Sequence, residues 1–271
     1  MSLDLRTLWD FSNPALSEER FRAALAGATG DDAVILRTQI ARTFGLRRDF
    51  DRARSELAET AAAAEQAGPE ARARYALELG RSYASATHAP EQRTPESAAA
   101  GRLQFERAWA TAREAGLDSL AIDAIHMLAF IDTAPADQMT WAQTALAVVT
   151  ASTQPDAQRW EAPVRHNLGF ALHQLGRFDE ALDQFQQAAA VRERGTDAGA
   201  TRVAWWMVAW TLRALNRLDE AVAIQSRLEI ECDQAGEPDP YVFEELETLH
   251  RQRGDLERAE HYASRRAATS A

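Results

Sequence analysis

Two histidines and one aspartate have the types and spacing that could carry chemistry. His126 and His166 are separated by 40 residues, and Asp123 precedes His126 by three. On a helix, three residues make about one turn, so the Asp123 carboxylate and the His126 imidazole share a face. Such groups can bind zinc or another transition metal, or act as an acid–base pair near neutral pH. His126 and His166 are therefore candidate metal ligands and, with Asp123, candidate catalytic residues. Hydrogen-bonded polar histidines are the competing interpretation.

Two tryptophans could form a binding surface. Trp206 and Trp210 are one helical turn apart and lie beside Trp205. Aromatic residues that repeat with helical spacing usually pack in a core, and Trp205 fits that interpretation. Trp206 and Trp210 fall outside the stripe of residues that we expect to be buried. They could stack against a partner side chain, a ligand ring or a cation.

The arginines suggest an anion-binding alternative. The chain carries a formal charge of -11 and contains no lysine, so arginine supplies its side-chain cations other than histidine. Arg42, Arg74 and Arg81 gather in the N-terminal part of the sequence, where they could hold an anionic group. The competing interpretation is an ordinary helix surface with weak ion pairs.

Composition and missing motifs exclude several classes of function. Without lysine, the chain lacks the residue for Schiff-base catalysis and for a phosphate-binding P-loop. There is no G-x-S-x-G motif, no glycine-rich phosphate loop and no pair of cysteines for a metal site. The acidic charge disfavours nucleic acid. No apolar run could span a membrane, and the N-terminus lacks the features of a secretion signal. We expect a cytoplasmic protein that needs no cofactor.

A repeated pattern of large and small residues must position these side chains. It is clearest over residues 164–194, where two amphipathic helices meet at Gly176. Aligned small residues then recur along the chain, and after the first interval they are 38 to 41 residues apart. The aligned positions are Ala53, Gly101, Ala142, Ala181, Ala221 and Ala259.

This period predicts an all-α fold of about six helical hairpins over residues 33–271, after a capping segment over residues 1–32. A polar, proline-containing insertion at residues 87–97 is expected to be a surface loop. Gly176, Asn216 and Gly254 each stand five residues before an aligned alanine, where we expect a left-handed turn to end the first helix. Small residues at positions 80, 129, 169 and 209 should let paired helices approach closely.

The segment GRFDEALDQFQQA, residues 176–188, resembles the tetratricopeptide repeat (TPR). The resemblance covers about residues 33–268 and implies a right-handed α-solenoid. The period exceeds the ~34 residues of a standard TPR, so extra residues should lengthen helices or connections. Proteins of this family bind peptides or protein partners in a concave groove lined by the first helix of each hairpin. That role is implied by the resemblance alone.

The TPR register also implies which residues line such a groove. Arginines come first along it, histidines and aromatic residues follow, and an acidic segment ends it. The expected groove residues are Arg42, Arg74, Arg81, His126, Phe130, His166, Phe170, His173, Trp206, Trp210, Arg213, Tyr241 and Glu244. We expect the remaining histidines, His88, His250 and His261, to face solvent.

We therefore expect a binding or scaffold protein that recognises a peptide, a protein segment, or a small anionic or aromatic ligand. The alternative is an enzyme that uses His126, His166 and Asp123 in the same groove. A third interpretation is a regulator resembling the peptide-sensing TPR proteins of bacteria, although no DNA-binding segment precedes the repeats here. Loss of binding on Trp206→Ala and Trp210→Ala would favour recognition. Bound metal that is lost on His126→Ala would favour the enzyme.

Overall fold

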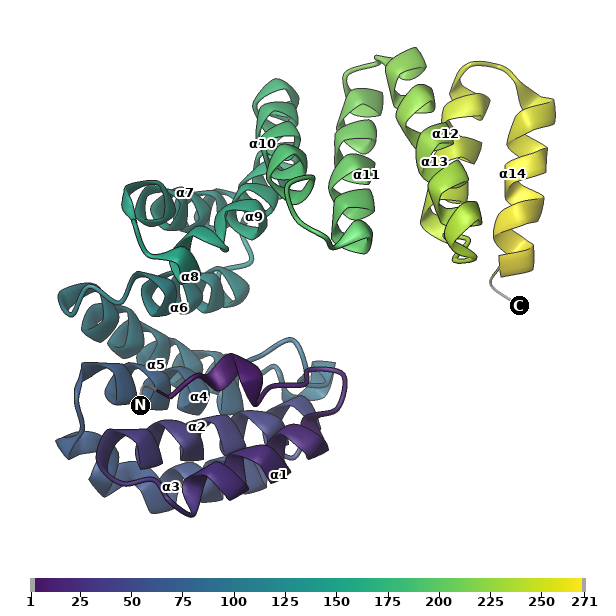
Figure 1. The fold of residues 1–271 in the computed structure, drawn as a ribbon. Helices are drawn as coiled ribbons and strands as arrows, with labels where there is room; N and C mark the ends of the chain where they lie inside the picture. Colours follow the sequence, from purple (N-terminus) through teal and green to yellow (C-terminus); the bar gives the residue numbers. More distant parts are fainter. Residues whose placement is uncertain (1–2, 270–271) are drawn as a thin grey trace. The chain divides into compact units, whose positions relative to one another are not determined.

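The computed structural model describes residues 3–269, and every regular element within that range is a helix (Figure 1). The chain divides into two compact units, one ending at Trp160 and the other beginning at Glu161, and each is described by itself. Consecutive helices pack as antiparallel pairs. The predicted all-α fold of helical hairpins is therefore confirmed, whereas the predicted boundary at residue 32 remains a prediction.

The first unit contains an N-terminal segment and three hairpins. Proline starts α4, α5 and α7, at the helical position where its missing N–H costs nothing. The short helix α8 is an addition that the repeat pattern does not predict. The elements are η1 (Leu5–Thr7), α1 (Pro14–Leu25), α2 (Gly30–Leu46), α3 (Phe50–Gln66), α4 (Pro69–Tyr83), η2 (Pro90–Gln92), α5 (Pro95–Glu114), α6 (Asp118–Ile131), α7 (Pro135–Ala151) and α8 (Pro155–Gln158).

The N-terminal segment covers the apolar face of the first hairpin. Phe21 on α1 is fully buried with Ile40 and Phe44 of α2. Trp9 packs edge-on against Phe21, with ring centroids 5.0 Å apart, and its indole N–H donates to Gln39 at 3.0 Å. This packing removes apolar surface from water that an end hairpin would otherwise expose.

The second unit contains three further hairpins. Its helices are α9 (Glu161–Gln174), α10 (Phe178–Arg192), α11 (Ala198–Ala214), α12 (Leu218–Ala235), α13 (Pro240–Gln252) and α14 (Leu256–Thr269). Leu228, Val242 and Leu246 form a buried cluster between the last two hairpins, and Trp205 and Trp206 pack against it. Each first helix thus has one face in the core of its own unit.

Glycines let the helices of a hairpin approach closely, as the pattern predicts. A Cβ built on Gly169 of α9 would lie 2.8 Å from the ring of Phe185 on α10, closer than real Cβ contacts. Gly80 of α4 faces the ring of Phe105 on α5 in the same way. In both hairpins a phenylalanine occupies the space that the absent side chain leaves.

The predicted left-handed turns are also present. Gly176, Asn216 and Gly254 have φ values of 73°, 57° and 77°. Each follows the first helix of a hairpin in the second unit. Glycine adopts this conformation without a steric penalty, and asparagine tolerates it better than most residues. The turn residues therefore set the sharp reversal between paired helices.

Most of the predicted insertion lies in the connection between α4 and α5, whereas residues 95–97 belong to α5, and this connection is anchored rather than simply solvated. Residues 84–94 connect α4 to α5, and within them His88 is only 5% exposed. The His88 ring stacks on Phe50 with centroids 3.6 Å apart, and its Nε2 lies 3.2 Å from the Ser82 carbonyl oxygen. The prediction that His88 faces solvent is wrong, because the loop uses this ring to fill a gap beside α3.

The prediction that His250 faces solvent is also wrong. It is 2% exposed on α13 and stacks on Tyr262 of α14, with centroids 5.6 Å apart. Burial lowers the pKa of His250, and Asp255 opposes that shift only in part. His261 is exposed as expected. His250 is buried because it adjoins Leu249 on the apolar face of α13, and its ring can pack flat against tyrosine.

Candidate functional site

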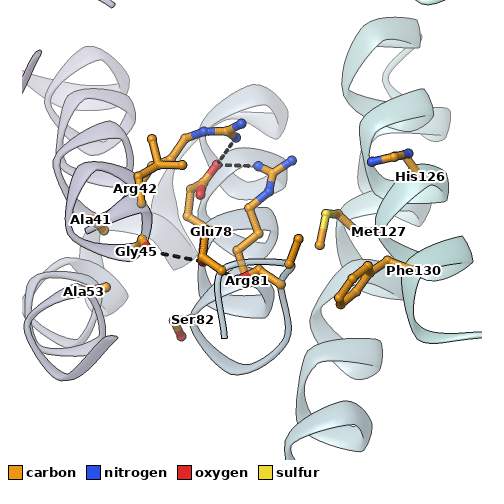
Figure 2. A pocket seen from close by; sticks show the side chains of 14 residues that line it. Ala41, Arg42, Gly45, Ala53, Glu78, Arg81, Ser82, His126, Met127 and Phe130 are labelled. Atoms are coloured by element: carbon orange, nitrogen blue, oxygen red, sulfur yellow. Dashed lines mark hydrogen bonds and ion pairs between the residues drawn. The ribbon is translucent and has the colours of Figure 1, made fainter. Parts of the chain in front are cut away.

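A pocket lies among α2, α4 and α6 of the first unit, and four predicted groove residues line it. They are Arg42, Arg81, His126 and Phe130, and the hollow has a volume of about 190 Å³. Figure 2 shows His126, Met127 and Phe130 on α6, turned toward α4, with the charged groups of α2 and α4 facing them. Its apolar part is formed by Ala41, Leu46, Ala53, Met127 and Phe130. The pocket therefore has a charged side and an apolar side.

Glu78 of α4 is the centre of the charged side. Its buried carboxylate accepts at Oε1 from Nη1 of Arg42, at 3.0 Å, and from Nη1 of Arg81, at 2.6 Å. Arg81 also donates through its other terminal nitrogen to Asp123 of α6. Two guanidiniums are thus balanced by two carboxylates. These contacts tie the first helices of three successive hairpins together.

Electrostatics keep the groups of this network in defined protonation states. Burial acts to raise the pKa of Asp123, but Arg81 and Arg42 outweigh it and hold that pKa below its usual value. Burial acts to lower the pKa of Arg81, and Asp123 and Glu78 reverse the shift. Desolvation lowers the pKa of His126, and Asp123 counters it only in part. His126 is therefore neutral at neutral pH and can both donate and accept a proton.

The loop between α4 and α5 supplies one wall of this pocket. Ser85, Ala86 and Thr87 line it, and the Thr87 hydroxyl donates to the Gly45 carbonyl of α2 at 3.2 Å. The Ser85 hydroxyl lies 2.8 Å from Nδ1 of His88, the buried ring described above. Because His88 is fixed by stacking, this wall has a defined position without any ligand.

Four aromatic side chains form a continuous row in the second unit, which we call the aromatic row: Phe170 and His173 of α9, and Trp206 and Trp210 of α11. The His173 and Trp210 rings stack with centroids 3.4 Å apart and planes 17° from parallel. Trp210 also lies near-parallel to Phe170 at 6.2 Å and to Trp206 at 6.1 Å. The indole N–H of Trp206 donates to the Tyr241 carbonyl of α13 at 3.2 Å. The row thus joins the first helices of successive hairpins.

The row is only partly covered by protein. Phe170 is 40% exposed, and Val203, one turn before Trp206, is 54% exposed. Tyr241 is 67% exposed, whereas Trp206 and Trp210 are half-buried. Large apolar side chains on three first helices are therefore open to water. A contiguous apolar patch of this kind often marks a contact surface.

Charged residues border the row but are paired. Arg213 of α11 forms a two-pronged ion pair with the buried Glu245 of α13, at 2.6 and 3.2 Å. Desolvation, with a further contribution from Arg213, lowers the pKa of His173 to about 4. Nε2 of His173 is buried and has no hydrogen-bond partner. His173 therefore acts as a neutral aromatic ring at neutral pH.

The other predicted site residues lie apart from these two places. Arg74 pairs with Glu70 at 2.8 Å on its own helix and does not line the pocket. His166 packs edge-on against Phe185, with centroids 5.7 Å apart, and desolvation lowers its pKa. Glu244 is exposed and lies 3.5 Å from Arg266. The structure thus groups part of the predicted site residues into one set in each unit and leaves Arg74, His166 and Glu244 outside both sets.

Among residues 3–269, no three histidine, cysteine, aspartate or glutamate side chains converge in a way that could hold a metal ion. His126 belongs to the first unit and His166 to the second. Asp123, the third residue of the proposed acid–base group, is paired with Arg81.

Among residues 3–269, no helix is both long and apolar enough to cross a bilayer.

Sequence reasoning missed several residues of the pocket. Glu78 is not among the predicted groove residues, yet it binds both Arg42 and Arg81. Met127 and Gly45 also line the pocket. Met127 directly follows His126, and Gly45 follows Phe44 near the end of α2. Their place in the sequence could have identified them, because each one adjoins a residue of the expected groove or core.

Comparison with known proteins agrees with this architecture. Residues 160–228, which cover α9 to α12 of the second unit, match the tetratricopeptide repeat family model. No curated protein sequence matches the chain.

Solved structures share the fold at low identity. A signal transduction ATPase with a tetratricopeptide repeat sensor from Pyrococcus horikoshii superposes with a TM-score of 0.74 at 12% identity, over 94% of this chain and 39% of that one. A protein from Podospora anserina described as a kinesin light chain with TPR-like repeats gives 0.54 at 16%, over 73% and 94%. The apo quorum sensor NprR from B. thuringiensis gives 0.52 at 10%, over 97% and 83%. This chain thus spans well under half of the Pyrococcus protein.

Proposed function

We propose that this chain, whose residues 160–228 match the tetratricopeptide repeat family model, is an interaction module whose second unit binds an extended segment of a protein partner. The TPR fold supports a protein-interaction or scaffold role in general. The finer proposal is that the partner lies across the aromatic row and contacts the first helices α9, α11 and α13.

The aromatic row is the observation that carries this proposal. A helix with one apolar stripe can bury it against its hairpin partner, as α11 does with Ala204, Met207 and Val208. Val203, Trp206 and Trp210 form a second apolar stripe on α11. Trp206 packs in part against the cluster of Leu228, Val242 and Leu246, but Val203 is exposed and Trp210 is only half-buried. The part of this stripe that stays open to water is free to contact another surface.

The row also suits an extended peptide energetically. Fully burying one large apolar side chain contributes roughly 1.5–3 kcal/mol, and aromatic rings offer this with little loss of side-chain freedom. The rings already stack on one another, so binding would order few side chains. Apolar or aromatic residues of the partner would pack on the exposed rings, while its backbone would meet the polar edges of the helices.

A peptide selection tests the proposal. Peptides are selected from a random display library on the full chain, and dissociation constants are then measured for variants. We expect Trp206→Ala and Trp210→Ala each to weaken binding roughly 30-fold or more, equivalent to about 2 kcal/mol, as for buried aromatic contacts at interfaces. Val203→Ser and Tyr241→Ser change exposed side chains and should weaken binding without loss of folding.

The matched control is Ile230→Ala, which removes an exposed apolar side chain from α12, a second helix of the same unit. It should leave binding unchanged. Circular dichroism and thermal melting would show which variants remain folded. Selected peptides that bind the Trp206, Trp210, Val203 and Tyr241 variants all as tightly as the wild type would contradict the proposal.

A further inference from the structure

We infer that the pocket among α2, α4 and α6 is a separate small-molecule site, and that it takes an uncharged ligand of about one ring carrying a group that both donates and accepts hydrogen bonds. A primary amide is such a group. The pocket lies wholly in the first unit, so this inference does not depend on peptide binding by the second.

Size limits the ligand. The pocket volume is about 190 Å³. An engineered protein cavity of ~150 Å³ binds benzene, so a pocket of this size accommodates one ring with a small substituent. Apolar side chains of Ala41, Leu46, Ala53, Met127 and Phe130 would surround that ring. The thioether of Met127 and the ring of Phe130 are both favourable neighbours for an aromatic group.

Charge balance argues against a free anion or cation. Arg42 and Arg81 are compensated by Glu78 and Asp123, and His126 is neutral at neutral pH. An anion reaching the two arginines would also meet the Glu78 carboxylate that both already bind. A cation reaching Glu78 would meet both guanidiniums. Desolvating a charged ligand would therefore gain no compensating net attraction.

The same network leaves hydrogen-bonding capacity for a neutral group. Both arginines donate to Oε1 of Glu78, so neither bond uses Oε2. Nε of Arg42 is buried and has no hydrogen-bond partner. The imidazole of His126 faces the same hollow. A primary amide could accept from an arginine N–H and donate to the glutamate, which neither a carboxylate nor an ammonium can do alone.

The pocket is preformed. Residues 85–87 of the loop between α4 and α5 form one wall, and His88 holds that wall by stacking on Phe50. The opposite wall, α6, is tied to α4 through Arg81 and Asp123. Binding therefore needs little free energy to order the site, which favours measurable affinity even for a small molecule.

Three probes of the same shape test the charge preference: benzamide, benzoate and benzylamine. The full chain contains four methionines, so a spectrum of methionine methyl groups labelled with ¹³C is simple, and Met127→Leu assigns the pocket signal. We expect benzamide to shift the Met127 methyl signal and to bind at least tenfold more tightly than either charged probe. Tighter binding of benzoate or benzylamine, or no binding of benzamide, would overturn the inference.

Gly45 offers a test of location. It lines the pocket, and a Cβ built there meets no atom within 4 Å. Gly45→Leu should fill the hollow and abolish the Met127 shift by benzamide, whereas Gly45→Ala should retain benzamide binding within a few-fold. Unchanged binding to a folded Gly45→Leu variant would place the ligand elsewhere and overturn the inference.

Discussion

His173 and His126 have similar side chains but face different electrostatic surroundings. His173 stacks on Trp210 beside Arg213, and no acidic group counters its desolvation, so its pKa falls to about 4. His126 has Asp123 one turn away, which opposes the downward shift. Both rings are neutral at neutral pH, but His173 is the one whose protonation most strongly opposes folding.

Replacing His173 should reduce the sensitivity of folding to acid. An unfolded histidine has a pKa near 6.5, so between about pH 6.5 and 4 the unfolded state binds the proton and the folded state does not. Stability therefore falls as the pH drops through this window and is unaffected above it. We expect His173 to contribute up to about 2 kcal/mol of that loss, allowing for its partial exposure.

Urea unfolding of the wild type and of His173→Gln at about pH 7.5 and about pH 5 would measure this contribution. The variant should lose less stability on acidification than the wild type. His88, His126, His166 and His250 also have lowered pKa values and remain in both proteins, so the difference reports on His173. An equal loss in both proteins would contradict the assignment.

At the residue scale, the sequence indicated which side chains lie near one another better than it indicated how their charges are paired. Arg42, Arg81, His126 and Phe130 do line one pocket, and Trp206 and Trp210 do stack on each other, although Trp206 also packs against a core cluster. Which charges cancel was not predictable, because that depends on side-chain directions across three helices. Glu78 holds two arginines at once, a geometry that no spacing along one helix reveals.

Glycine has opposite roles in two helices of this fold. Gly169 on α9 faces the ring of Phe185, so its missing side chain is required for helix packing. Gly45 on α2 faces open space, so there the missing side chain only weakens the helix. The periodic pattern identified the first role, because position 169 belongs to the repeated series of small residues.

Alanine at these two glycines should change stability in opposite directions. Gly169→Ala should destabilise the protein by about 1–3 kcal/mol, because the added methyl overpacks against Phe185. Gly45→Ala should stabilise it by roughly 0.5–1 kcal/mol, because alanine favours the helix and meets no clash. Chemical denaturation measures both. The packing account would be wrong if Gly169→Ala were as stable as the wild type.

Helices and turns were predictable because each hairpin repeats the same local rules. Gly176, Asn216 and Gly254 have the left-handed backbone that their spacing predicts. The loop between α4 and α5 was predictable in large part, but its role as a pocket wall was not. Its anchor, His88, follows no periodic pattern and is buried only because Phe50 offers a flat ring to stack on.

At the scale of the whole molecule, each unit has its own apolar core. In the first, Phe105, Leu128 and their neighbours are buried together, and in the second Leu228, Val242 and Leu246 form a core cluster. The division near residue 160 leaves no trace in the regular spacing of the repeats, and so the sequence did not predict it. Contacts in such folds are mostly between neighbouring hairpins.

The second unit should fold without the first. Residues 161–271 produced alone should be helical and unfold cooperatively, because their core clusters lie within that range. Circular dichroism would measure the helix content, and binding of the selected peptides should match that of the full chain. An unfolded fragment would contradict this view of two self-sufficient cores.

The central claim is that a partner segment lies on the aromatic row, and fluorine NMR of the chain labelled with 5-fluorotryptophan tests it most directly. The sequence has seven tryptophans, so each signal can be assigned by single substitution. On titration with a selected peptide, the signals of Trp206 and Trp210 should shift, and those of Trp9, Trp109 and Trp141 in the first unit should not. Shifts confined to the first unit, with Trp206 and Trp210 unchanged, would contradict the claim.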